Sequence, residues 1–496
     1  ARRADATSRA WAMLSAMLDG STDGEQALLL RKMAKRDTVT KLKALSELRE
    51  ALSAHGASWA AELMPHWVPH FVRLSGDGSW QVRESACAAL GQLASLLGRQ
   101  LAPHLRPLMA AWLCAKHDPH GGTAAAAAAA FGFAFPNPRK YADALLFCRD
   151  ELARGLAERA LSAPPAAASD KDEAAAAADA HARRVGSALR AASHLLAVTA
   201  ESGVAPAGAR SALEAALCGG EVWRLGSAAS SFVRTGAYGW AGSVLSHSTA
   251  LAAGTAAEMA GLLLGGLKES EPACHAALWE PLLLLLRDHG AAVSSSAAAR
   301  HTLPRLVSLL EHGCHGAAPT VARALLPLVS LLPAPLFEPP ASAALPPAAA
   351  LLAALWQGLG ASALPPQHGA HLLRAYGELL QLLVVRTSAG GAGAAPLLRE
   401  ALCGRAAAVI GGDAPQRISP DEAAAGLADA AVRIALSSRC APSTASMWAD
   451  LVRAVARAAS DAAAGTSPGH VPAGEGGAGG GGEAARAAAS ASRLLR

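Results

Sequence analysis

Apolar residues recur every three or four positions along the first third of the chain, which is the spacing of one face of an α-helix. One such stripe predicts a helix that begins after a capping residue, Asp37 or Thr38, and ends at Gly56. Its members are Leu42, Leu45, Leu48 and Leu52. A shorter helix is expected before it, from Asp23 to about Lys35. Few stretches alternate apolar and polar residues with period two, so the pattern indicates an all-α protein.

Two helical hairpins with a common layout follow. Each has a proline-containing helix, a turn with an aspartate and a second, apolar helix. The predicted elements are, in order, 59–74, the turn 76–78, 80–97, 101–116, the turn 118–122 and 123–133. Pro65 and Pro103 are 38 residues apart and Asp77 and Asp118 are 41 apart, which is the period of HEAT and armadillo repeats. Since each hairpin must bury two apolar faces, we expect a HEAT/ARM-like helical-repeat solenoid.

The turn of the first hairpin resembles that of a HEAT repeat. It reads Asp77-Gly-Ser-Trp-Gln-Val82-Arg83. The aspartate is placed to accept hydrogen bonds from free amides at the start of the second helix, with Val82 in the core and Arg83 outside it. Four tryptophans in this block are expected to fill the core or gaps between repeats, and a peptide-binding groove is the alternative. They are Trp59, Trp67, Trp80 and Trp112.

Changes in composition divide the chain into six segments. Proline pairs and a charged run interrupt the helical pattern after the first block, and a glycine-rich run follows the last helix. The segments are an N-terminal segment (1–22), an N-terminal HEAT domain (23–160), a linker or exposed loop (161–182), middle helical repeats (183–387), a C-terminal helical block (388–464) and a disordered Gly/Ala tail (465–496). The firmest middle helices are 279–286, 303–310 and 321–332.

The longest uncharged run, residues 339–367, has the length of a membrane span. It contains six prolines and is rich in alanine, which contributes little to membrane insertion. We therefore predict a buried helix over 348–359 and no contact with a membrane.

Composition argues against a metal site or an enzyme centre. Aromatic residues are only 4% of the chain, and its eight cysteines show no two-residue CxxC spacing, so reduced thiols in the cytosol are expected. Two clusters hold three possible zinc ligands each: Cys114, His117 and His120, and His312, Cys314 and His315. Neither has a second ligand pair, so we expect no metal or cofactor here. No coherent catalytic constellation is visible either.

The segment from Arg31 to Lys43 carries the most concentrated charge. Its six basic residues are Arg31, Lys32, Lys35, Arg36, Lys41 and Lys43. With one acid, Asp37, the segment has a net charge of +5, equal to that of the whole chain. It is either a solvated helix end or a docking surface for RNA phosphates or an acidic protein. No aromatic residues are interleaved, so reading of single-stranded sequence is not expected. Three further arginines, Arg83, Arg99 and Arg106, would extend the surface if the solenoid brought them near.

Six segments of the first third of the chain are distinctive together. The first is Arg31-Lys-Met-Ala-Lys-Arg-Asp-Thr-Val-Thr-Lys-Leu-Lys-Ala-Leu-Ser-Glu-Leu48. The others are Leu63–Trp67, Val82–Glu84, Gln100–Leu113, Phe133–Pro136 and Ala144–Glu151. In this order, the segments resemble the N-terminal domain of the listerin family of RING-type ubiquitin ligases. Good matches cover about residues 25–155, and beyond them only helical-repeat character is visible.

The resemblance implies a long HEAT/ARM solenoid that acts in ribosome-associated quality control. Such proteins bind the 60S ribosomal subunit that carries a stalled nascent chain, together with a cofactor that marks the chain. A C-terminal RING, which binds zinc, recruits an E2 enzyme to ubiquitinate the nascent chain. The implied protein is a cytosolic monomer, and its docking residues here would be the six basic residues. No cysteine and histidine set in this chain has RING spacing, so docking is expected of it and catalysis is not.

One other function fits the repeat pattern, and a third does not. A general HEAT-repeat adaptor or transport scaffold, which binds proteins but no ribosome, has the same repeat period. A self-contained enzyme would need a catalytic constellation that the sequence lacks.

Overall fold

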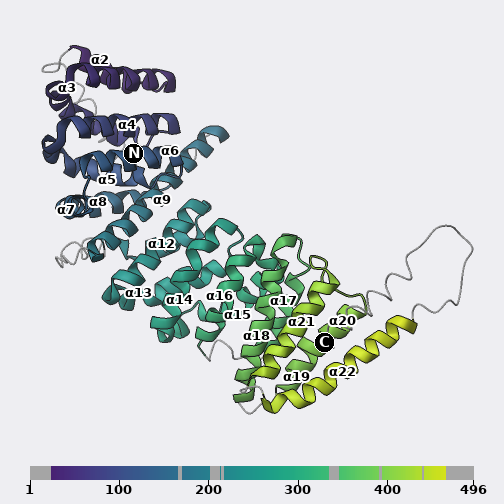
Figure 1. The fold of residues 1–496 in the computed structure, drawn as a ribbon. Coiled ribbons are helices and arrows are strands. Elements are labelled where there is room, and N and C mark those ends of the chain that lie inside the picture. The colour runs from purple at the N-terminus through teal and green to yellow at the C-terminus, as the bar shows by residue number, and fades with distance from the viewer. Residues whose placement is uncertain are drawn as a thin grey trace, which may run out of the picture. The chain divides into compact units, whose positions relative to one another are not determined.

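The computed structural model describes residues 24–165, 170–201, 213, 217–333, 346–389, 394–437 and 441–464. All regular elements in these ranges are helices, as predicted (Figure 1). The chain forms two compact units, Ala1–Thr255 and Ala256–Arg496. The expected N-terminal segment (1–22) and Gly/Ala tail (465–496) lie outside the described residues.

Unit 1 is a stack of helical hairpins. Its helices are α2 (Gly24–Met33), α3 (Thr38–Leu74), α4 (Trp80–Leu97), α5 (Leu105–Lys116), α6 (Gly121–Ala134), α7 (Pro138–Phe147), α8 (Arg149–Ala160), α9 (Lys171–Glu201), α11 (Gly220–Trp223) and α12 (Ser231–His247), with short 3₁₀ turns η1 (Gly98–His104) and η2 (Arg224–Ser227). Helix α13 (Thr249–Gly265) begins in unit 1, and its larger part, from Ala256, belongs to unit 2. Helix α4 packs on α3 and α6, α8 on α5 and α9, and α9 on α12. Neighbours in sequence are therefore neighbours in space, which defines a solenoid.

The predicted break at Gly56 is confirmed. Helix α3 is continuous by hydrogen bonding, but Gly56 has φ 71° and ψ −154°, so two helices meet there at a kink. A backbone angle of this kind favours glycine, which has no Cβ. Leu45, Leu48 and Leu52 are fully buried on the first half of α3, as their spacing predicts.

The expected linker or exposed loop at 161–182 is wrong in its second half. Helix α9 begins at Lys171, and Asp170 accepts hydrogen bonds from the backbone amides of Asp172 and Glu173 at 2.7 and 3.2 Å. The alanine run that follows has the highest intrinsic helix propensity, so this capped segment continues as a helix with a largely exposed first half.

Unit 2 repeats the same construction. Its helices after α13 are α14 (Pro272–Ser295), α15 (Thr302–Glu311), α16 (Ala318–Leu331), α17 (Pro347–Gly358), α18 (Gly369–Ala389), α19 (Ala395–Leu398), α20 (Arg405–Ile410), α21 (Pro420–Leu436) and α22 (Ala441–Ala464). The short elements are the 3₁₀ turns η3 (Gly266–Lys268), η4 (Ala299–His301), η5 (Gly313–Gly316) and η7 (Pro366–His368) and the π-helical η8 (Arg399–Gly404). Helix α16 packs on α14 and α18, α15 on α17, and α18 on α21.

The helix predicted at 348–359 is α17, and its leucines and Trp356 are buried. Within the described ranges one segment, Thr249–Lys268, is long and apolar enough to cross a membrane, with a mean hydropathy of 1.4. Half of its apolar window is buried inside the protein, which is also usual for a core helix of a soluble repeat protein.

Candidate docking surface

The basic segment forms the end of α2, a short turn and the start of α3. Asp37 caps α3, because its carboxylate accepts hydrogen bonds from the Thr40 amide at 2.7 Å and the Thr40 hydroxyl at 2.6 Å. These hydrogen bonds hold the pKa of Asp37 below its usual value. At the other side of the turn, the Arg73 guanidinium donates to the carbonyls of Met33 and Ala34. Side chains therefore provide hydrogen-bond partners for backbone groups at the end of α2 and at the start of α3.

Lys41 does not belong to an exposed surface. Its ammonium lies 2.6 Å from the Asp77 carboxylate, which comes from the following hairpin turn, and its side chain is only 11% exposed. The pair ties the start of α3 to the turn before α4. The charge of Lys41 is used inside the repeat stack and is not presented to a partner.

Lys32 also has a partner in the chain, since its ammonium lies 2.7 Å from the Glu47 carboxylate on α3. This pair is about one-third exposed, so water still reaches both groups. The remaining four basic residues are exposed at the α2–α3 corner: Arg31, Lys35, Arg36 and Lys43. We call these four the N-terminal basic surface. Docking by this segment stays a prediction.

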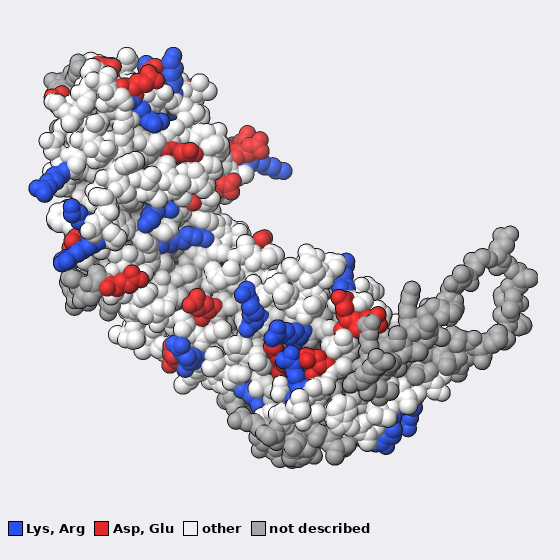
Figure 2. Space-filling view, in the orientation of Figure 1, with Lys and Arg blue, Asp and Glu red and all other residues white. Residues whose placement is uncertain are grey.

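Charge elsewhere is dispersed. On the face shown in Figure 2, lysines and arginines occur in small groups that alternate with acidic residues and wide uncharged areas. Of the arginines expected to extend the surface, Arg99 and Arg106 are both exposed, and Arg106 lies 3.7 Å from Glu151 and over the ring of Phe147. A strong positive field over the whole chain is not expected from this distribution.

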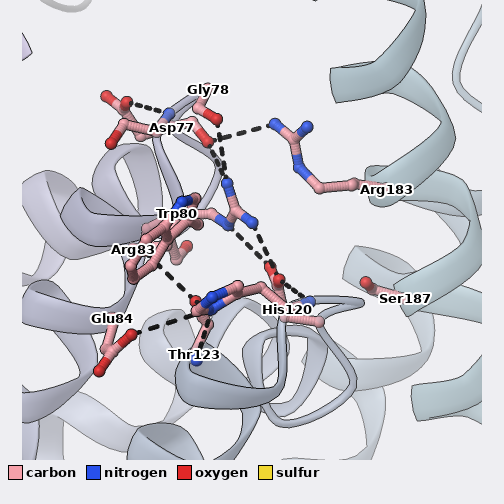
Figure 3. Close-up of polar contacts among 12 residues, drawn as sticks. Asp77, Gly78, Trp80, Arg83, Glu84, His120, Thr123, Arg183 and Ser187 are labelled. Atoms are coloured by element: carbon pink, nitrogen blue, oxygen red, sulfur yellow. Dashed lines mark hydrogen bonds and ion pairs between the residues drawn. The ribbon is translucent and has the colours of Figure 1, made fainter.

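Arg83 was expected outside the core, and that prediction is wrong. It is 3% exposed, and its guanidinium donates to both carboxylate oxygens of Asp118, from Nε at 2.8 Å and from Nη2 at 2.9 Å. A third donor, Nη1, reaches the carbonyls of Asp77 and Gly78 (Figure 3). The guanidinium thus links the turn of one hairpin to the turn of the next. Val82 is fully buried, as predicted.

This contact continues into α9. The Arg183 guanidinium donates to the Asp77 carbonyl at 3.2 Å (Figure 3). The Ser187 hydroxyl donates to the His117 carbonyl at 3.0 Å. The Asp77 carboxylate also accepts a hydrogen bond from the Ser79 amide at 3.0 Å, within the turn, but no side chain caps the amides of α4 itself, so the capping role predicted for Asp77 is wrong. These hydrogen bonds therefore join the turn at Asp77, the turn at Asp118 and helix α9.

Three of the four tryptophans fill the core as predicted: Trp59, Trp67 and Trp112. Trp80 differs, because it begins α4 and is 44% exposed. Its ring stacks on the His120 imidazole with centroids 4.1 Å apart. The described tryptophans of this block therefore do not line a common groove.

The two histidine and cysteine clusters do not gather ligands. Within the described ranges, no group of three or more His, Cys, Asp or Glu side chains is placed to hold a metal ion. His120 caps α6 by accepting a hydrogen bond from the Thr123 amide at 3.2 Å. His117 instead lies beside His194 of α9, with ring centroids 5.4 Å apart.

Lowering the pH is expected to loosen the α5–α9 contact. Burial, aided by neighbouring cations, lowers the pKa of His117 to about 3 and that of His194 to about 4. Both values lie below the unfolded value near 6.5, so the unfolded chain takes up these protons first as the pH falls. The free energy of unfolding should then drop by at most about 1.4 kcal/mol per pH unit for each histidine, between about pH 6.5 and pH 4.

Amide hydrogen exchange of α5 and α9 in wild type and His117→Phe, at about pH 7 and pH 5 and corrected for the intrinsic pH dependence of exchange, measures this effect. The variant should lose less stability than wild type between the two pH values. Equal losses in the two proteins would contradict the assignment of the pH dependence to His117.

Helical hairpins stacked through buried turn contacts define the class of HEAT-type repeat scaffolds. Within that class, the chain belongs to the listerin family: the family profile described as "E3 ubiquitin-protein ligase listerin, N-terminal domain" matches residues 18–332. This match confirms the resemblance seen in residues 25–155 and extends it into unit 2.

Curated relatives agree with the profile. The chain is 28% identical over 325 residues to the E3 ubiquitin-protein ligase listerin of Mus musculus and 27% identical over 327 residues to that of Gallus gallus. Each alignment covers 65% of this chain but only 18% of the relative, so the chain spans less than a fifth of the length of these proteins.

Solved structures with a similar course of the chain include two helical proteins. The TSC2 N-terminus is 12% identical with a TM-score of 0.31, and covers 96% of this chain and 100% of that one. The karyopherin Kap121p bound to the SUMO protease Ulp1p is 10% identical with a TM-score of 0.32, over 94% of this chain and 52% of that one. Scores this low assign neither fold nor function.

Proposed function

We propose that this chain is a scaffold of a listerin-type E3 ubiquitin ligase that docks on the 60S ribosomal subunit carrying a stalled nascent chain. The observation that carries the proposal is the N-terminal basic surface, Arg31, Lys35, Arg36 and Lys43, within a domain of the listerin family. Flexible cations on one exposed corner suit contacts with rRNA phosphates, whose strength depends on salt. A RING elsewhere in the full-length protein would bind zinc and recruit the E2 enzyme.

The same proposal includes the expected setting of the protein. It acts in the cytosol as a monomer, beside the cofactor that marks the nascent chain. No cofactor or metal is assigned to the described residues.

Charge reversal of the N-terminal basic surface is expected to weaken binding to purified 60S particles at least tenfold. The variant carries Arg31→Glu, Lys35→Glu, Arg36→Glu and Lys43→Glu. Lys41 is left unchanged because its ion pair with Asp77 is buried, so its loss would damage the fold. Cosedimentation at several salt concentrations measures the affinity, and the salt dependence should become shallower in the variant.

A matched control reverses four exposed basic residues elsewhere in unit 1: Arg139→Glu, Lys140→Glu, Arg154→Glu and Lys171→Glu. It changes the net charge equally and should retain most of the binding. Equal losses in both variants would show a diffuse charge effect and contradict this placement of the surface. Absence of 60S binding in wild type, with capture of a defined non-ribosomal protein, would favour the adaptor function.

A further inference from the structure

A cavity in unit 2 gathers basic side chains that the docking proposal does not use. Its volume is about 430 Å³, and it lies between η3, η4, α15 and η5. Four of its lining residues are basic: Lys268, His301, Arg305 and His315. No described aspartate or glutamate lines it. Its volume falls in the range of small-molecule sites.

Arg305 is fixed in this cavity with a donor to spare. Its Nη1 donates to the Leu264 carbonyl at 3.1 Å, which anchors the guanidinium to the end of α13. Its Nε is shielded from water and has no hydrogen-bond partner in the structure. The buried Nε is out of reach of a ligand, so the terminal N–H groups of the guanidinium are the donors that Arg305 offers to an anion in the cavity.

The turn that brings His315 to the cavity is strained. Four successive residues of η5 have left-handed φ angles, 62° at Gly313, 56° at Cys314, 47° at His315 and 86° at Gly316. Two of them are not glycine, and such conformations persist only where packing enforces them. Cys314 is fully buried, and a Cβ on Gly313 would lie 2.9 Å from Leu364. Packing therefore holds a costly turn that places His315 in the lining of the cavity.

The positive charge of the lining lies on Lys268 and Arg305. Partial desolvation lowers the pKa of His301, and Arg300, Arg305 and Lys268 lower it further through their charges. Burial and His312 lower the pKa of His315, whereas Glu269, which is buried and not part of the lining, raises it. An anion would therefore meet two cations, Lys268 and Arg305, and two imidazoles that can each donate an N–H.

We propose that this cavity binds a small molecule carrying at least two phosphate groups, either free in solution or as the headgroup of a lipid. Arginine and lysine are the usual phosphate ligands, and the four basic residues come from four separate elements, so they can meet more than one phosphate. The exposed lining residues, Lys268, His301 and Pro304, mark the side of the cavity that is open to a ligand.

Titration calorimetry of the whole chain with pyrophosphate and with inositol hexakisphosphate, at constant ionic strength, tests the proposal. Wild type should bind at least one of the two, and Arg305→Gln and Lys268→Gln should each raise the Kd about tenfold or more. Lys268 is exposed, so its variant should fold normally even if Arg305→Gln loses its anchor to Leu264. Arg323→Gln, an exposed arginine of α16 outside the lining, should bind like wild type.

Vesicles of phosphatidylcholine with or without phosphatidylinositol bisphosphate separate the two sources of phosphate. Lys268-dependent binding to the phosphoinositide vesicles, stronger than to the soluble probes, would assign a lipid headgroup, and the reverse order a free anion. Failure of folded wild type to bind any probe, or equal weakening by Arg323→Gln and Lys268→Gln, would overturn the proposal. This test is independent of 60S binding.

Discussion

Replacing Arg83 with alanine should lower the free energy of unfolding of unit 1 by about 3–5 kcal/mol. The substitution removes a guanidinium that is 3% exposed and leaves the Asp118 carboxylate, whose side chain is 6% exposed, without its charged partner. It also removes the hydrogen bonds to the carbonyls of Asp77 and Gly78. A buried charge without a partner costs more than a lost surface ion pair, which is usually worth about 0–1 kcal/mol.

Amide hydrogen exchange, read separately for α4 and α6, is the suitable measurement because the chain has two units and need not unfold in one step. Protection of both helices should fall together, since the pair joins their turns. Arg99→Ala, at an exposed position two residues after α4, should change protection by no more than about 0.5 kcal/mol. Similar exchange in Arg83→Ala and Arg99→Ala would refute the structural role of the pair.

A double variant separates the cost of leaving the Asp118 carboxylate without its partner from the cost of removing the Arg83 side chain. Arg83→Met with Asp118→Leu removes both charges and fills the space with apolar groups, so it should be more stable than Arg83→Ala alone. A double variant that is less stable than the single one would show that the Asp118 carboxylate stabilises its turn without Arg83, through the hydrogen bond that it accepts from the His120 amide at 2.8 Å.

The hairpins of unit 1 were predictable because their signals are local. The leucine stripe, the Asp37 cap, the break at Gly56 and the 41-residue spacing of Asp77 and Asp118 all lie within one repeat or between equivalent positions. Each is a pattern that backbone geometry alone imposes. The helical class and the order of the hairpins follow from these signals.

The placement of Arg83 and Lys41 was not predictable with the rules applied, because each depends on a partner in another hairpin. Arg83 meets Asp118, and Lys41 meets Asp77, more than thirty residues away in both cases. A signal for Lys41 did exist, since it precedes Leu45 by four residues and Leu48 by seven and therefore shares their buried face. The N-terminal basic surface was not predictable from local spacing either, because its exposure depends on how the turn between α2 and α3 folds.

The second half of the expected linker shows a different error. Charged and small residues at 170–182 suggested a loop, but alanine favours helix strongly and Asp170 supplies a cap. Low complexity by itself therefore did not indicate irregular structure. Similarly, the basic cavity of unit 2 joins residues from 268 to 315, and no spacing in the sequence marks them as a group.

The second large effect is expected from Gly358→Ala, at the end of α17. A Cβ at this position would lie 2.0 Å from the Leu310 carbonyl oxygen of α15, a backbone atom that cannot rotate away. The two helices would have to separate or the end of α15 would have to shift, and overpacking of this kind costs about 3 kcal/mol. Since η5 also packs against this glycine, the left-handed turn should loosen as well.

The same substitution at Gly261 is a control that should raise the free energy of unfolding where Gly358→Ala lowers it. Gly261 lies in α13, is exposed, and has no atom within 4 Å of its would-be Cβ, so alanine there should stabilise unit 2 by about 0.5–1 kcal/mol. Exchange of the amides in α15 and α17 should become faster in Gly358→Ala and stay the same or slow down in Gly261→Ala. If Gly358→Ala leaves the protection of both helices intact, the close approach of α15 to α17 is not a constraint on this fold, and the packing argument for the strained turn fails with it.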